Sequence, residues 1–307
     1  MDVKPKKAPR ELTFENIDNG VLRLRTKPSG RLAYSFIPAY DHPKSIAKPG
    51  ESGGEPLLVF LSGLDNPKAV WQRTLDRLFE SACAIGAELP PMLFYDRFGI
   101  GGSDADPQDE GKKPEEFHDC NDAMGDLHQL IVQIMEMKFG WNRHIDPDVK
   151  QHLPRIVFCA HSFGVCIARM FATAHSGAVQ GILMIDSAIA YIRAEHTMPD
   201  PDDPVSWAKR NDGESIWSKA GWPDESILSK DVVRDAIRKT RASPISGNPL
   251  TTRERMRWDH MPQQLPRSDE PKLRGPTDHL PLISVLKSDP EILALKQSQV
   301  WINNSLL

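Results

Sequence analysis

The chain has 307 residues, 39% of them hydrophobic, which is enough to bury a sizeable core in one large domain or two small ones. Its formal net charge of -4 argues against a surface that neutralises phosphates, and therefore against a nucleic-acid partner. The first residues carry charges without an apolar segment behind them, and no stretch approaches the roughly 20 apolar residues that span a bilayer. We therefore expect no membrane span and a cytoplasmic location.

The cysteines show neither the paired spacing of a metal site nor the density of a disulfide scaffold. We expect free, buried thiols at Cys83, Cys120, Cys159 and Cys166. No cluster of histidines and cysteines has the spacing of metal ligands, so neither a metal nor an organic cofactor is predicted.

The chain opens with two alternating segments, 20–25 and 31–39, which are separated by the turn residues "TKPSG" at 26–30. This pattern predicts an antiparallel hairpin. A linker rich in Pro, Gly and Ser leads to "LLVFLSG" at 57–63, a continuous apolar run of the kind found in strands that are covered on both faces.

Strand and helix patterns alternate after this run. Helical spacing over 68–85 places Val70, Leu75, Leu78 and Phe79 on one stripe. The later elements are a strand at 90–96, a helix at 115–140 that ends at Gly140, a strand at 153–160, a helix after Ser162 and a strand at 181–186. This rhythm predicts an α/β fold with a mostly parallel sheet and helices on both of its faces.

Four regions follow from the composition. Residues 1–20 are expected to be an N-terminal extension and 21–190 the α/β core. Residues 191–278, rich in Pro and holding four tryptophans, are expected to be an inserted, mainly helical cap. Residues 279–307 return to the core with a buried strand and a helix, and this C-terminal part is expected to be incomplete.

Ser162 lies where an apolar strand turns into a helix, and such a tight corner needs the small neighbours that Ala160 and Gly164 supply. The turn places the backbone N–H of Phe163 at a helix N-terminus, which favours a developing negative charge. A second N–H, from Gly63 or Leu64, is expected at the same edge of the sheet. Together they predict a nucleophile facing an oxyanion hole.

Three segments resemble motifs of the α/β-hydrolase fold, and specifically of its serine hydrolases with a cap. "FLSGLD" at 60–65 resembles the oxyanion strand and loop, "YDRFGIGGSD" at 95–104 resembles a strand and turn of the group, and "AHSFG" at 160–164 resembles the nucleophile elbow. Asp96 and Arg97 are expected to serve the fold, and His161 to pack or to line the substrate site.

The resemblance implies a triad in the chain order Ser, acid, His. Its acid is either Asp289 or Asp186, and the sequence has no His after His279, so the chain is expected to lack the segment that bears the histidine. Three explanations remain open: a shortened chain, an inactive relative, or a displaced base. The candidate displaced bases are His196, His260 and His279.

The sequence therefore predicts a serine hydrolase that acts on an ester, thioester or amide of a small, apolar substrate through an acyl-enzyme on Ser162. The alternative is a catalytically inactive protein of the same fold that binds a small molecule. The oligomeric state is not predicted.

Overall fold

The computed structural model describes residues 17–38, 56–87, 89–141, 153–187, 252–257, 264–265 and 282–286. The predicted helix at 290–304 lies outside these residues, and so does the predicted cap apart from 252–257 and 264–265.

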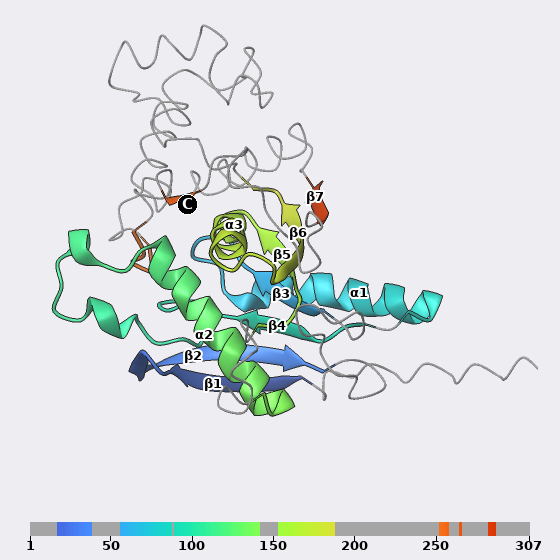
Figure 1. Ribbon diagram of the computed structural model, residues 1–307, viewed down its shortest axis with the longest axis horizontal. Coiled ribbons are helices and arrows are strands. Elements are labelled where there is room, and N and C mark those ends of the chain that lie inside the picture. Colours follow the sequence, from blue (N-terminus) through green and yellow to red (C-terminus); the bar gives the residue numbers. More distant parts are fainter. Residues whose placement is uncertain are drawn as a thin grey trace, which may run out of the picture.

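A seven-stranded sheet forms the centre of the described part, with the strand order β1-β2-β4-β3-β5-β6-β7 (Figure 1). Strand β2 pairs antiparallel with both β1 and β4, and every other pair is parallel. The predicted mostly parallel sheet is confirmed. The strands are β1 (Asp18–Leu24), β2 (Lys27–Ile37), β3 (Leu57–Leu61), β4 (Met92–Tyr95), β5 (Ile156–His161), β6 (Val179–Ile185) and β7 (Leu282–Leu286).

The predicted hairpin exists, but its turn was placed too late in the chain. Leu24 already pairs with Lys27, so 27–30 belong to β2 rather than to the turn. The reason is the Lys27 side chain, which is 2% exposed and binds the carboxylates of Asp106 and Asp126 inside the molecule. Strand β1 begins at Asp18, three residues before the expected start of the core.

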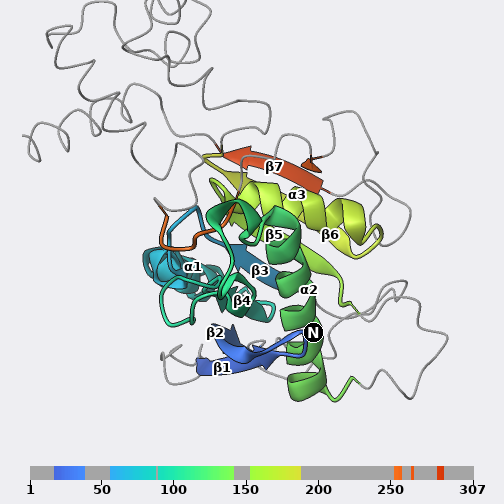
Figure 2. The ribbon, with the colours of Figure 1, turned by 90° about the vertical axis from the view of Figure 1, so that its left-hand side faces the viewer.

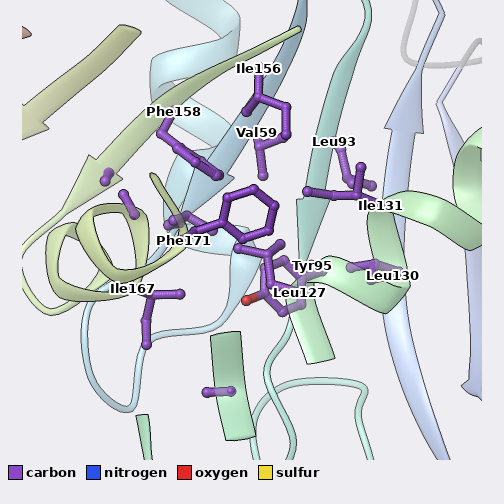
Figure 3. Packing of buried hydrophobic residues seen from close by; sticks show 14 of the residues in the cluster. Val59, Leu93, Tyr95, Leu127, Leu130, Ile131, Ile156, Phe158, Ile167 and Phe171 are labelled. Atoms are coloured by element: carbon purple, nitrogen blue, oxygen red, sulfur yellow. The ribbon is translucent and has the colours of Figure 1, made fainter. Parts of the chain in front are cut away.

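Helices cover both faces of the sheet, as predicted (Figure 2). Helix α1 (Gln72–Ile85) packs on one face, and α2 (Cys120–Phe139) and α3 (Gly164–Ala174) pack on the other. Strand β3 shows the alternation that this layering requires, because Leu57, Val59 and Leu61 belong to the α2 and α3 side while Phe60 belongs to the α1 side. Val59, Phe158 and Phe171 meet at the centre of the larger core (Figure 3).

Helix α2 begins five residues later than predicted because a capping box forms at its start. The Asp119 carboxylate accepts the N–H groups of Asn121 and Asp122, and the Asp122 carboxylate accepts the N–H of Asp119. Residues Pro114–Glu116 form a separate 3₁₀ turn. The helix ends at Gly140 with φ of 64°, as predicted.

The predicted apolar stripe of the first helix is wrong at Val70. Residues Lys68–Trp71 form a 3₁₀ turn ahead of α1, and this changes which side chains face the sheet. Val70 is 46% exposed, whereas Trp71 is buried and its indole Nε1 donates to Ser62 Oγ over 3.0 Å.

All four cysteines are free; three are buried and Cys83 is partly exposed. Among the described helices, none has both the length and the apolar run needed to cross a membrane. The described residues also contain no group of three or more His, Cys, Asp or Glu side chains placed to hold a metal ion.

Candidate functional site

Ser162 occupies a two-residue turn between β5 and α3, and its backbone is left-handed with φ of 50°. A left-handed conformation in a residue with a side chain costs about 1–3 kcal/mol and is typical of functional sites. The turn is held by a hydrogen bond from Ser162 N to Ile185 O (3.0 Å) and by another from Val165 N to Ser162 O (3.1 Å). Ser162 is only partly buried.

Gly164 allows α3 to approach β3 closely enough for this turn to form. A Cβ at Gly164 would lie 2.5 Å from the carbonyl oxygen of Leu61 and 2.9 Å from Leu61 Cβ. Any side chain at this position would push the helix away from the strand. The sequence-based expectation that a close approach requires this glycine is therefore supported by the packing.

The loop after β3 lies directly against the turn that carries Ser162. A Cβ at Gly63 would lie 3.3 Å from Ser162 Cβ and 3.2 Å from His161 Nδ1. Ser62 fixes the start of the loop, since its hydroxyl accepts from the Trp71 indole and lies 3.4 Å from the carbonyl oxygen of Pro67. The structure thus brings Gly63 and Ser162 together as the sequence predicted.

Three backbone N–H groups belong to the turn of Ser162 and to the loop after β3, those of Phe163, Gly63 and Leu64. Phe163 is the N-cap residue of α3, so its N–H belongs to the positive end of the helix. Among the backbone hydrogen bonds of the turns and loops in the described part of the chain, none has the N–H of Phe163, Gly63 or Leu64 as its donor. Such donors can stabilise an oxygen that gains negative charge.

The two cysteines that flank the turn are not competing nucleophiles. Burial raises the pKa of the Cys159 thiol to about 11. Burial is also the largest effect on the Cys166 thiol, whose pKa is raised to about 11. Both thiols are therefore protonated at neutral pH, and the thiolate is the reactive form.

Asp186 follows β6 and borders the same turn. Its backbone is left-handed with φ of 44°, and its N–H donates to Leu286 O over 2.8 Å. The next residue, Ser187, donates from its hydroxyl to the carbonyl oxygen of Ser162 over 2.9 Å. One acid candidate is thus placed beside Ser162, while the other, Asp289, lies outside the described residues.

The histidines in the described part of the chain contact aromatic rings, a carboxylate or one another. His161 meets Trp71 edge to face with 6.5 Å between ring centroids, and His118 Nδ1 lies 2.7 Å from the Asp109 carboxylate. His128 and His175 stack on each other with centroids 4.3 Å apart. The candidate bases His196, His260 and His279 lie outside the described residues.

Asp96 joins the loops that follow two neighbouring strands. Its carboxylate accepts the backbone N–H of Lys68 (2.5 Å) and that of Gly102 (3.0 Å), and it pairs with the Lys68 ammonium. Arg97 is buried and binds the carbonyl oxygens of Ser62 and Gly63 as well as Glu254. The contacts of both residues agree with the structural role that the sequence predicted for them.

Sequence reasoning missed Asp65 and Glu254, which complete the support of the loop after β3. The Asp65 N–H donates to Glu254 Oε1 over 2.6 Å, and Asp65 Oδ1 accepts the N–H groups of Arg253 and Glu254. No local pattern could have found them, because 189 positions separate the two acids.

No protein-family model matches the chain, and no curated protein matches it. Solved structures that it resembles include a carboxylesterase of Nitrososphaera gargenis (16% identity, 72% of this chain and 65% of that chain, TM-score 0.36). Another is epoxide hydrolase A of Mycobacterium thermoresistibile (15% identity, 64% of this chain and 44% of that chain, TM-score 0.34). A third is a putative epoxide hydrolase of Pseudomonas aeruginosa (15% identity, 81% of this chain and 70% of that chain, TM-score 0.39). The chain spans less than two thirds of the length of the first two. These likenesses are distant.

Proposed function

We propose that the chain is a serine hydrolase of the α/β-hydrolase type, with Ser162 as the nucleophile. The observation that carries the proposal is the left-handed, partly exposed Ser162 between β5 and α3, in contact with the loop of Gly63. This is the geometry that a strand-to-helix nucleophile elbow requires.

In the proposed reaction, Ser162 Oγ attacks the carbonyl carbon of an ester, thioester or amide. The hydroxyl proton passes to a general base, and the carbonyl oxygen becomes an oxyanion that the N–H groups of Phe163 and of Gly63 or Leu64 stabilise. The C–O, C–S or C–N bond then breaks, the leaving group takes up the proton, and an acyl-enzyme remains. Water attacks the acyl-enzyme and releases the acid.

The acid of the triad has two candidates, and each would orient the base and stabilise its cation. Asp186 is supported by its place after β6, where Ser187 binds the Ser162 carbonyl. Asp289 is supported by the resemblance alone. The base is sought among His196, His260 and His279, the displaced bases that the sequence leaves open.

A fluorophosphonate probe tests the nucleophile directly, because it reacts covalently with activated serine hydroxyls. We expect one probe per chain in the wild type, seen by intact mass and located at Ser162 by peptide mapping, and none in Ser162→Ala. Ser35→Ala, a matched serine change on β2, should label as the wild type does. A folded wild-type sample that takes up no probe would contradict the proposal and favour the alternative, a catalytically inactive protein of the same fold that binds a small molecule.

A further inference from the structure

Arg97 is buried where the two halves of the proposed oxyanion hole meet. Its side chain is 7% exposed and donates from Nη1 to Ser62 O (2.8 Å) and from Nη2 to Gly63 O (2.6 Å). The same guanidinium lies over the ring of Phe163, with Cζ 5.7 Å from the ring centroid. One side chain therefore contacts both the loop after β3 and the residue that follows Ser162.

These contacts fix the direction of the loop's backbone N–H groups. In a planar trans peptide, a carbonyl and the N–H of the next residue point in opposite directions. Because the carbonyls of Ser62 and Gly63 face the guanidinium, the N–H groups of Gly63 and Leu64 face away from it. A cation bound to a peptide carbonyl also polarises that peptide, which makes its N–H a stronger donor.

Glu254 holds Arg97 in this position. The residue is 1% exposed, and its carboxylate accepts two charge-assisted hydrogen bonds from the guanidinium, from Nε to Oε2 (2.7 Å) and from Nη2 to Oε1 (2.6 Å). Its Oε1 also accepts the N–H of Asp65, whose backbone is left-handed with φ of 57°. Through these bonds the segment 252–257 is attached to the loop that starts at Ser62.

A buried ion pair of this kind needs a reason other than stability. Well-packed apolar side chains of the same volume are often as stabilising or more so, since both charges must leave water. Burial acts to lower the pKa of Arg97, but the Glu254 carboxylate outweighs it and the pKa is raised, so the guanidinium stays charged. Its charge is then available to the two peptides that it contacts.

We propose that Arg97, held by Glu254, is a positioning residue that sets the direction and donor strength of the backbone N–H groups of the oxyanion hole. The inference rests on the proposed function. Arg97 acts through the peptides of Ser62, Gly63 and Leu64 and does not itself touch the substrate.

Three variants test this role. Arg97→Met removes the charge and keeps much of the length, while Glu254→Gln keeps the shape and one acceptor but releases the ion pair. Ile131→Ala is the matched control, because Ile131 is fully buried in the core on α2 and its loss lowers stability without touching the loop. All three are compared well below their melting temperatures.

Amide hydrogen exchange measures whether the loop is held. The N–H groups of Asp65 and Asn66 are bonded to Glu254 and to Gly63 O, so they are protected in the wild type. We expect them to exchange about 10-fold faster or more in Arg97→Met and Glu254→Gln, and at a near wild-type rate in Ile131→Ala. Should Arg97→Met fail to fold, Glu254→Gln is judged at the Asn66 N–H, because Glu254 is itself the acceptor of the Asp65 N–H.

The rate of fluorophosphonate labelling at Ser162 measures the consequence for the reaction. Loss of one oxyanion donor costs about 100-fold to 1,000-fold in rate, so a loosened loop should cost at least about 10-fold in Arg97→Met. Unchanged exchange at Asp65 and Asn66 would overturn the inference, and so would faster exchange with an unchanged labelling rate. A wild type that is never labelled defeats the proposed function instead, and the exchange data then decide whether Arg97 holds the loop.

Discussion

The substitution Gly164→Ala tests how tightly α3 packs against β3 at the turn that carries Ser162. The new Cβ would lie 2.5 Å from Leu61 O, where ordinary contacts begin at 3.4 Å, so α3 and β3 must separate by about 1 Å. Overpacking of this size costs about 1–3 kcal/mol, and Ala in place of Gly in a helix returns up to about 1 kcal/mol. We therefore expect a net loss of about 1–2 kcal/mol.

Calorimetry and probe labelling measure the two consequences of this substitution. A loss of that size should lower the melting temperature by about 2–6 °C. Because Ser162 is two residues before Gly164, a shift of about 1 Å should also slow labelling by about 100-fold.

Gly125→Ala is the matched control for this experiment. Gly125 lies inside α2, and a Cβ there would have no atom within 4 Å. The control should gain about 0.5–1 kcal/mol from helix propensity and label at the wild-type rate. If Gly164→Ala instead melts at or above the temperature of Gly125→Ala, the close approach of α3 to β3 does not limit this site, and the reasoning fails.

Two further predictions concern buried charge. Burial, with a smaller effect of His128, lowers the pKa of His175 to about 4, so the stability that its neutral ring contributes is present above about pH 6.5 and is lost as the pH falls toward 4. Between pH 7 and pH 4.5, the free energy of unfolding measured in urea should therefore fall by about 1 kcal/mol less in His175→Gln than in the wild type, a difference kept small because the ring is partly exposed. An equal fall in both proteins would contradict this. Lys27→Met leaves the carboxylates of Asp106 and Asp126 without their cation and should cost about 3–5 kcal/mol at pH 7. Burial already raises the pKa of Asp126 to about 6 against the effect of Lys27, so the cost should shrink by pH 5, and an equal cost at both pH values would count against it.

The parts of the fold that the sequence predicted are those whose cause is local. The apolar run at 57–61 and the glycine at position 63 predicted β3 and the loop that follows it. The small residues around Ser162 predicted the turn between β5 and α3. The start of α2 was predictable as well, because Asp119 and Asp122 have the spacing of a capping box. The prediction missed it by giving weight to apolar spacing alone.

The errors arose where contacts between distant residues decide the structure. The turn of the first hairpin lies earlier than predicted because Lys27 binds Asp106 and Asp126, which are 79 and 99 positions away. The support of Gly63 by Arg97 and Glu254 joins residues 157 positions apart. Local patterns carry no information on such pairs, and this is why the sequence placed Ser162 and Gly63 but not the side chains that hold them.

Strand β7 makes the region around Asp186 less stable to heat than the rest of the sheet. It is one of the two edge strands of the described sheet, and its last carbonyl accepts the N–H of Asp186. Its apolar side chains from Leu282 to Leu286 are exposed, so the prediction of a buried strand is wrong. Little buried surface anchors this strand, so on warming it should fray before the interior melts. Asp186 would then lose its hydrogen bond to Leu286 while the rest of the sheet stays intact, and the proposed hydrolase activity would be lost at a lower temperature than the fold itself.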